Sequence, residues 1–518
     1  MGARGGDPET LDRQGLVGQM FMVDFSGPEP SAEVERLLTE GGVGGVVVFD
    51  KNVEAPIQVA RLSNALQRLA ARAGQPPLLL AADQEGGPVV RLRGTHFPSA
   101  MAFGAAASDR LVAQAARVTA RELRAVGIHV NFAPVLDVNS NPANPVIGVR
   151  SYGEDPAPVA RLGVQAVTAM QAAGVLATAK HFPGHGDTSL DSHLALPTVA
   201  HPRGRLEAVE LLPFVAAIRA GVAAVLTAHV VYPALDPDRP ATLSPAIIGV
   251  LRRELGFQGL VVSDSMRMRA IVDHYRPGDA AVEAVLAGVD LVLALGPAEA
   301  QWEAIEAVRA AAETGRIPSA RLHEAAGRVL AAKRRLGLFE RALVREGDVA
   351  GSVGLPEHIA LAHRIAAAAA TNVRDRPGAV PLPPGSVSVA TGLAPGDTVA
   401  RLAEALRAAG RPAASVTLGP ETPPQGAIVV PIGGGAPSDP DFSARVYEVT
   451  LEASGYGPTI AVSTDVPYPL ARVAPRCACL AVYGADPAAL HAAAGVLTGA
   501  VRPRGRLPVT VSAAPDAA

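Results

Sequence analysis

The chain has 518 residues, of which 49% are hydrophobic and 18% charged, and its formal net charge is −3. This length exceeds what one hydrophobic core usually organises, so two domains are expected, and the composition favours a well-buried α/β protein. Aromatic residues make up only 4% of the chain and basic residues are not in excess. These values exclude a stacking or phosphate-binding surface for nucleic acid and a basic surface for anionic lipid.

The N-terminal segment 1–10 contains no apolar core of signal-peptide length, and position 6 lacks the serine or threonine of a myristoylation signal. No apolar run is long enough to span a membrane. Cys477 and Cys479 are separated by one residue, so they are expected to be small buried side chains rather than a disulfide framework. The sequence thus predicts a soluble, cytoplasmic protein without a membrane partner, and it does not define an oligomeric state.

Short apolar segments alternate with helical stretches over the first two-thirds of the chain. Apolar residues recur at helical spacing in 111–126 and 159–173, and a further helix is expected over 319–336 with Ser319 as its cap. Eight segments are expected to be strands: 19–24, 44–49, 78–83, 128–133, 175–181, 222–229, 260–264 and 289–294. Eight strands with crossover helices fit a (β/α)8 barrel, and a doubly wound open sheet is the alternative.

The position of the polar residues favours the barrel. They lie at or just past the C-terminal ends of the expected strands: Asp24, Asp50, Asp83, Asp137, His181, His229 and Asp264. In a closed barrel these ends converge on one mouth, whereas an open sheet would spread them along an edge. The first part of the chain is therefore predicted to be a TIM barrel with a site at its C-terminal face.

The composition changes near residue 375. The segment 375–385 is rich in proline and is expected to be a stiff linker. Five strands are expected beyond it, at 387–390, 415–418, 427–432, 459–463 and 480–483, with helices at 398–409 and 488–497. The predicted organisation is a catalytic barrel over 1–340, a linker region over 341–385 and a smaller αβα-sandwich domain over 386–518.

The segment 180–193 is the densest polar cluster of the barrel part. One lysine and three histidines fall within it, although the whole chain has only 12 histidines. The cluster begins where an expected strand ends, and Gly184 and Gly186 break regular structure. A strand that delivers titratable groups into a glycine-rich loop is a common way to build an active site.

Two carboxylates are candidates for chemistry. Asp191 lies two residues before His193 in an expected loop, so it can turn back, hydrogen-bond the imidazole and favour the protonated ring as a general acid. Asp264 ends a buried strand between two serines, which makes it a candidate nucleophile or oxocarbenium stabiliser. The alternative is that Asp264 or Ser265 caps the following helix.

Two further segments combine acids, glycines and arginines. Asp83 begins the run Asp-Gln-Glu-Gly-Gly and is followed by Arg91, and Arg150 lies in a loop that prolines restrict. Either arginine could be a plain surface charge. Their convergence with the other strand ends favours a clamp for a polar, hydroxyl-rich ligand.

These motifs resemble glycoside hydrolase family 3, and they are most similar to its NagZ-like β-N-acetylglucosaminidase branch. The resemblance covers roughly residues 15–340, and its four segments are 83–91, 146–151, 180–193 and 263–268. Residues 505–510, Gly-Arg-Leu-Pro-Val-Thr, are similar to a turn near the end of the second domain in that family. No residue of the second domain can be given a role from the motifs.

The resemblance implies a retaining double displacement at the barrel mouth. Asp264 would be the nucleophile, His193 the acid/base and Asp191 its partner in the dyad. Five residues would hold N-acetylglucosamine: Asp83, Arg91, Arg150, Lys180 and His181. The histidine–aspartate pair would then replace the second carboxylate that retaining glycosidases usually carry.

The implied substrate is terminal β-linked N-acetylglucosamine on muropeptides or chito-oligosaccharides, with neither a metal nor a cofactor. A phosphorylase with the same site and a family 3 β-glycosidase of other sugar specificity are alternatives. Outside the family, the chain could be a non-catalytic sugar-binding protein or a metallohydrolase. The ligands of the metallohydrolase would be His181, His185, Asp187 and His193. Lys180 counts against the metal.

Overall fold

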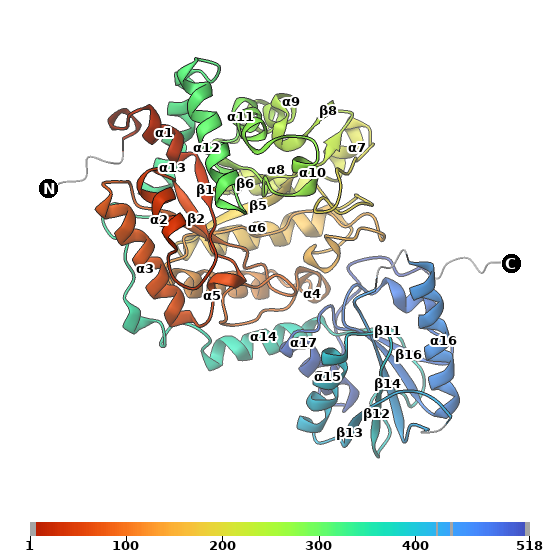
Figure 1. Cartoon of the computed structure of the whole chain (residues 1–518). Helices are drawn as coiled ribbons and strands as arrows, with labels where there is room; N and C mark the ends of the chain where they lie inside the picture. Colours follow the sequence, from red (N-terminus) through yellow and green to blue (C-terminus); the bar gives the residue numbers. More distant parts are fainter. Residues whose placement is uncertain (1–6, 421–422, 436–438, 513–518) are drawn as a thin grey trace.

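The computed structural model describes residues 7–420, 423–435 and 439–512 and shows a barrel followed by a second α/β unit (Figure 1). The predictions about a signal peptide and myristoylation concern the segment 1–10, of which residues 1–6 lie outside the described residues. Eight parallel strands pair in the order β10-β1-β2-β3-β4-β5-β6-β9, and a bridge between Val262 and Leu291 joins the two ends of this order. The strands are β1 Phe21–Val23, β2 Gly45–Val47, β3 Leu79–Ala82, β4 Val130–Asn131, β5 Leu176–Phe182, β6 Ala224–Thr227, β9 Leu260–Val262 and β10 Val292–Leu293. Each lies within or overlaps a predicted strand, and the predicted (β/α)8 barrel is confirmed.

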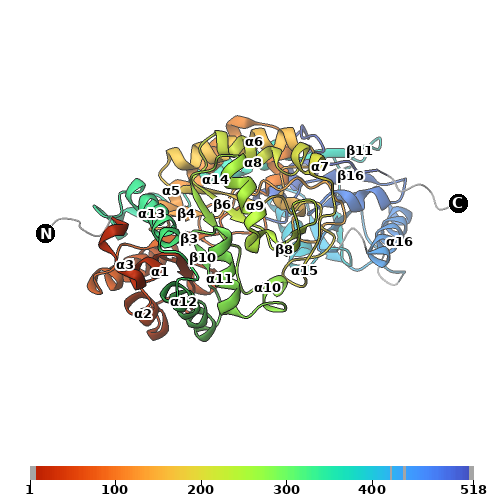
Figure 2. The same ribbon diagram turned by 90° about the horizontal axis from the view of Figure 1, so that it is seen from above.

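Helices surround the strands on the outside of the barrel (Figure 2). The main ones are α1 Arg13–Gln19, α2 Ala32–Thr39, α3 Pro56–Arg72, α4 Ala100–Ala106, α5 Asp109–Ala125, α6 Pro156–Ala172, α7 Arg203–Ala208, α8 Leu212–Arg219, α9 Pro245–Gly249, α10 Arg269–Val272, α11 Pro277–Ala287, α12 Ala298–Glu313 and α13 Ser319–Arg335. The prediction that Ser319 caps α13 is wrong. Pro318 occupies the cap position and has no side-chain donor or acceptor, while the Ser319 hydroxyl lies 3.3 Å from the ring of His323.

Alternate residues of each barrel strand face opposite sides. Both sides are buried, so the strands are apolar throughout. Met22 and Leu79 belong to the cluster that fills the barrel interior. Their neighbours Phe21, Val23 and Leu80 belong to the cluster that packs against the helices. A strand buried on both faces reads as a continuous apolar run in the sequence, and this property made the eight strands recognisable.

Lys333 on α13 is fully buried at the end of the barrel opposite the active site, where its amine donates a hydrogen bond to Gln19, the last residue of α1. Burial lowers the pKa of Lys333 from its ordinary 10.5 to about 7. Between these two pH values the unfolded chain binds more protons than the folded one, so this group makes stability rise with pH across that window. Below pH 7 the unfavourable contribution of Lys333 is constant and at its largest.

Lys333→Met is therefore expected to stabilise the protein, and to do so more at pH 6 than at pH 10. Methionine keeps the length of the side chain and removes the amine, so the barrel interior stays filled. The test is to measure the midpoint of thermal unfolding of the variant and of the wild type at both pH values. The difference between the two proteins should be larger at pH 6. An equal difference at the two pH values would show that Lys333 does not change its proton affinity on folding.

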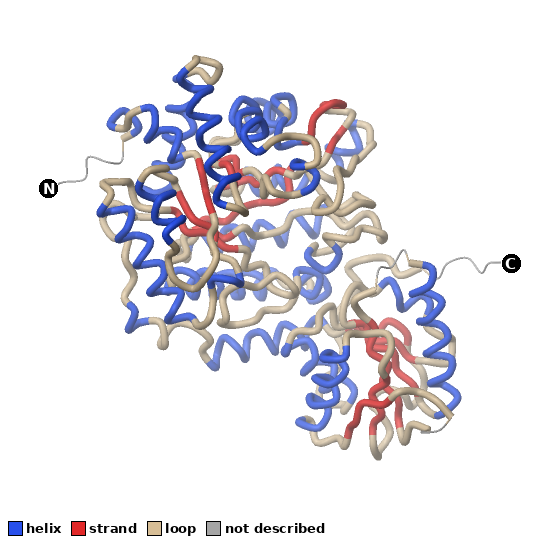
Figure 3. The backbone as a smooth tube through the Cα atoms, viewed as in Figure 1, coloured by secondary structure: helices blue, strands red, loops and turns tan. Residues whose placement is uncertain are grey.

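The second unit is a six-stranded sheet with helices on both faces, and the predicted αβα sandwich is confirmed. Its order is β11-β16-β15-β14-β12-β13, with β11 antiparallel at the edge. The strands are β11 Thr371–Arg374, β12 Val387–Ala390, β13 Ala413–Val416, β14 Ala427–Ile432, β15 Thr459–Ser463 and β16 Ala478–Ala481. The helices are α14 Pro356–Ala369, α15 Gly396–Ala408, α16 Pro440–Tyr456 and α17 Pro487–Leu497. α16 covers one face and α15 with α17 the other (Figures 1 and 3).

The region predicted as a linker, 341–385, contains α14 and β11. Since β11 pairs with β16, the proline-rich segment 375–385 connects two strands of the second sheet instead of the two domains, which corrects that prediction. The sequence hid β11 because an edge strand needs little apolar surface: of its four residues only Thr371 is buried. Cys477 and Cys479 are buried and free, as predicted.

The segment 505–510, which resembles a family turn, lies between the two units. The backbone N–H of Arg506 donates to Ala105 of α4, and that of Glu154 donates to Pro508. A Cβ atom at Gly153 would lie 2.5 Å from the Pro508 carbonyl oxygen, so glycine is required for this close approach. No helix in the described part of the chain is long and apolar enough to cross a membrane.

Candidate active site

The C-terminal ends of the barrel strands surround a cavity of about 690 Å³. Seven of the eight predicted site residues line it: Asp83, Arg91, Arg150, Lys180, His181, His193 and Asp264. The eighth, Asp191, contacts the ring of His193. The structure thus brings the whole predicted set to one place, from the loops and ends of β3, β4, β5 and β9.

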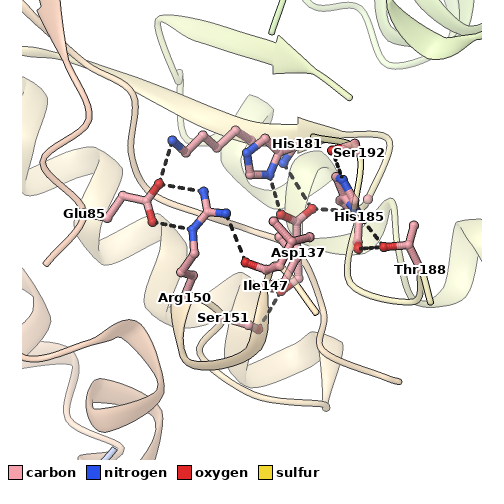
Figure 4. A network of polar contacts seen from close by, with 12 residues as sticks. Glu85, Asp137, Ile147, Arg150, Ser151, His181, His185, Thr188 and Ser192 are labelled. Carbon is pink, nitrogen blue, oxygen red and sulfur yellow. Dashed lines mark hydrogen bonds and ion pairs between the residues drawn. The ribbon is translucent and has the colours of Figure 1, made fainter. Parts of the chain in front are cut away.

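A cluster of ion pairs forms one wall of the cavity (Figure 4). The amine of Lys180 lies 2.6 Å from Asp83 Oδ1 and 2.7 Å from Glu85 Oε1. Arg150 donates two hydrogen bonds to Glu85, from Nε at 2.9 Å and from Nη2 at 2.8 Å. Glu85 was not predicted as a site residue, although it lies inside the motif that Asp83 begins.

The electrostatics of this wall keep Glu85, Arg150 and Lys180 ionised. Burial raises the pKa of Glu85, but the charges of Arg150 and Lys180 outweigh burial and hold that pKa far below its usual range. Burial lowers the pKa of Lys180, and the carboxylates of Asp83 and Glu85 reverse this, so the net shift is upward. The wall therefore presents charged donors and acceptors, which bind the hydroxyl groups of a sugar through strong hydrogen bonds.

Lys180 and His181 are neighbours on β5, yet both line the cavity. In a regular strand they would point to opposite faces. The pairing of β5 with β6 shifts register between Lys180 and Phe182, so the regular alternation of side chains is interrupted there. The strand thereby delivers two functional groups to the same side.

Asp137 orients the histidine side of the site. Its Oδ2 lies 2.7 Å from His181 Nδ1, and its Oδ1 accepts the backbone N–H groups of His181 at 3.1 Å and His185 at 2.7 Å. Asp137 is fully buried. Because Nδ1 of His181 is held by the carboxylate, Nε2 is the nitrogen left to contact a ligand in the cavity. The sequence placed Asp137 at a strand end but gave it no role.

Asp264 follows β9, and its Oδ1 accepts the backbone N–H of Ser265 at 2.6 Å. Burial raises the pKa of Asp264, but the charges of His181 and His229 and the Ser265 N–H outweigh burial and bring that pKa below its ordinary value. The carboxylate is thus ionised at neutral pH. The alternative in which Asp264 or Ser265 caps the next helix is wrong, because α10 begins at Arg269 with Met268 in the cap position.

The predicted dyad is formed in the loop after β5. Asp191 Oδ1 lies 2.7 Å from His193 Nδ1 and accepts the backbone N–H of His193 at 2.8 Å. The carboxylate therefore fixes the ring with its proton on Nδ1, and Nε2 is free to exchange a proton with a ligand. The side chain of His193 is 59% exposed, as expected for a group at the mouth of the cavity.

The residues that would bind a metal in the metallohydrolase alternative contact different partners instead. Both ring nitrogens of His185 lie against hydroxyl groups, Nδ1 at 2.9 Å from Thr188 and Nε2 at 2.8 Å from Ser192. Asp187 pairs with His201 at 2.6 Å. Within residues 7–420, 423–435 and 439–512 no three histidine, cysteine, aspartate or glutamate side chains are grouped to hold a metal ion.

Comparisons with known proteins agree with this geometry. The family model described as the glycosyl hydrolase family 3 N-terminal domain matches residues 10–332. Beta-hexosaminidase A of Pseudoalteromonas piscicida is 38% identical over 411 residues, which are 71% of this chain and 68% of that protein. A beta-hexosaminidase of Alkalilimnicola ehrlichii is 40% identical over 295 residues, 55% of this chain and 82% of that protein. Among solved structures, a glycoside hydrolase family 3 beta-N-acetylglucosaminidase from Paenibacillus sp. is 40% identical with a TM-score of 0.89, covering 98% of this chain and 100% of that chain.

Proposed function

Because the chain belongs to glycoside hydrolase family 3, we propose that it is a retaining exo-β-N-acetylglucosaminidase acting on muropeptides or chito-oligosaccharides. One observation carries the proposal: an ionised aspartate and a histidine held by a second aspartate line the same cavity. The beta-hexosaminidase relatives and the beta-N-acetylglucosaminidase structure support the sugar assignment.

In the first step, the Asp264 carboxylate attacks the anomeric carbon of the bound sugar. The glycosidic C–O bond breaks as His193 passes the proton on Nε2 to the leaving oxygen, and an ester joins the sugar to Asp264. The Asp191 carboxylate supports this step because it stabilises the imidazolium before the transfer. In the second step, His193 takes a proton from water, whose oxygen attacks the anomeric carbon and releases Asp264.

The ion-pair wall would hold the sugar. Lys180 and Arg150 supply cationic donors, while Asp83 supplies an acceptor for hydroxyl groups. Arg91, which pairs with Asp50 at 3.1 Å, and His181 complete the set proposed to bind N-acetylglucosamine. Bonds of this kind fix the anomeric carbon against Asp264 and thereby remove much of the entropic part of the barrier.

Incubation with nitrophenyl β-N-acetylglucosaminide and nitrophenyl β-glucoside, each with and without phosphate, tests the function. We expect the first to be the better substrate and free N-acetylglucosamine to be the main product. In the intermediate the carboxylate of Asp264 is an ester and the acid/base is a histidine, so phosphate meets less repulsion than in a site whose acid/base is a second carboxylate. Water is nevertheless present at far higher concentration, so hydrolysis should dominate.

The reaction product is separated and its mass is measured, and its identity decides between the candidate functions. N-acetylglucosamine 1-phosphate as the main product in millimolar phosphate would make the chain a phosphorylase. Faster release from the glucoside would assign another sugar specificity. Undiminished activity after a chelator is added is expected, because every step above uses side chains of this chain alone.

A further inference from the structure

Ser192, between the two members of the dyad, is the one buried residue of the segment 189–194. Ser192 is 1% exposed, whereas the side chains of Asp191 and His193 are 24% and 59% exposed. The leucines on either side, Leu190 and Leu194, are 52% and 65% exposed. A loop with so much exposed surface has few apolar contacts to hold it, so its position depends on the residues that it does bury.

The hydroxyl of Ser192 lies 2.8 Å from Nε2 of His185, which is itself buried. His185 Nδ1 lies 2.9 Å from the hydroxyl of Thr188. Burial, together with the charge of His181, lowers the pKa of His185 to about 4, so this ring is neutral when the enzyme works near neutral pH. A neutral imidazole has one donor and one acceptor nitrogen, and each of them meets a hydroxyl group (Figure 4).

The direction of these hydrogen bonds follows from Asn144. Its amide donates to the Thr188 hydroxyl at 3.2 Å, and the Thr188 hydroxyl donates to the backbone carbonyl of His185 at 3.2 Å. Thr188 is then the acceptor for His185 Nδ1–H, which leaves Nε2 as the acceptor for the Ser192 O–H. The Asn144 side-chain carbonyl accepts the backbone N–H groups of Val146 and Ile147, in the loop that leads to Arg150.

We propose that Ser192 is the positioning residue of the acid/base: its hydrogen bond to the buried His185 holds the loop so that His193 faces the bound sugar. Through Thr188 and Asn144 the same chain of hydrogen bonds joins this loop to the loop that carries Arg150. The position of the proton donor is thereby fixed relative to the sugar-binding wall. The proposal rests on the function proposed above, in which His193 is the acid/base. Ser192 borders the cavity but is almost fully buried, and in this proposal it acts through His193.

The test compares Ser192→Ala with Ser189→Ala in the full chain. Ser189 belongs to the same loop, is exposed, and its side chain makes no hydrogen bond within the described structure, so it is a matched control. Two substrates are used: N,N′-diacetylchitobiose, whose leaving sugar needs a proton, and a dinitrophenyl β-N-acetylglucosaminide, whose leaving group does not. Thermal unfolding of each variant is measured alongside.

For Ser192→Ala we expect kcat on the disaccharide to fall about 10- to 100-fold, the range expected when a catalytic group is displaced by about 1 Å. KM should change little, because the sugar-binding wall is intact. The rate of dinitrophenol release in the first turnover should stay within about twofold of wild type, since departure of this group needs no proton. Ser189→Ala should match the wild type on both substrates.

The role is overturned if Ser192→Ala behaves like Ser189→Ala, or if it slows both substrates equally. Should Ser192→Ala not fold, His185→Leu, whose side chain has no acceptor, removes the same bond from its other end and should show the same dependence on the leaving group. Equal losses on the two substrates would again reject the role. Absence of wild-type turnover on both substrates would instead reject the proposed function. Normal wild-type activity with an unaffected Ser192→Ala rejects the positioning role alone.

Discussion

Asp264→Ala is expected to lower kcat on the order of a thousandfold or more and to leave the protein folded. Without the carboxylate no ester intermediate can form, and the positive charge that develops at the anomeric carbon loses its stabilising partner. The fold should survive because Asp264 caps no helix and its carboxylate accepts only one hydrogen bond in the described structure, from the neighbouring backbone N–H. Removing this carboxylate will also lower the proton affinity of His229, because the charge of Asp264 raises the pKa of that ring.

Two measurements separate this loss from damage to the fold. Asp273→Ala, an exposed aspartate that pairs with Arg269 on α10, should keep wild-type rates and serves as the control. A fluorinated sugar that forms a slowly hydrolysed ester should add its mass to the peptide that contains Asp264 in the wild type and to no peptide of Asp264→Ala. Near-native turnover by Asp264→Ala, or a label on another carboxylate, would remove Asp264 from the nucleophile role.

The sequence predicted the barrel well because its signals are local. Strands such as β3 are buried on both faces and so form apolar runs, and the polar groups Asp83, Lys180 and Asp264 follow where such runs end. Once the barrel is closed, these ends must meet. The dyad is also local, since Asp191 and His193 are two residues apart and need only a turn to make contact.

Partners that are distant in the sequence could not be predicted. Glu85 contacts Arg150 and Lys180 only after β3, β4 and β5 are assembled. No spacing pattern in the sequence predicts which carboxylate an arginine will pair with. The burial of Ser192 could not be predicted for the same reason. It depends on the hydrogen bond to His185, whose backbone carbonyl is in turn bound by Asn144 from a distant loop. The edge strand β11 was missed for the opposite reason, since it has too little apolar surface to leave a pattern.

His193→Ala is expected to slow substrates with poor leaving groups by about 100- to 10,000-fold, the usual contribution of a general acid. The leaving oxygen of a disaccharide departs as an alkoxide unless it receives a proton. Asp191, the other member of the dyad, lies against Nδ1 of the ring and not at Nε2, from which the proton is transferred. An activated aryl group departs without protonation, so its first step should be much less affected. The expected result is therefore a steep dependence of the rate on the pKa of the leaving group.

The second chemical step gives an independent test of the role of His193. Water attacks the ester with the help of a general base, so His193→Ala should slow this step for every substrate, whatever its leaving group. With a dinitrophenyl substrate the variant should release about one equivalent of dinitrophenol per enzyme rapidly and then continue slowly, as the ester on Asp264 accumulates. Asp191→Asn, which keeps a hydrogen-bond acceptor but removes the charge, should fall between wild type and His193→Ala. If rates on disaccharide and aryl substrates fall equally and no rapid release is seen, then His193 helps to bind the sugar and another group transfers the proton.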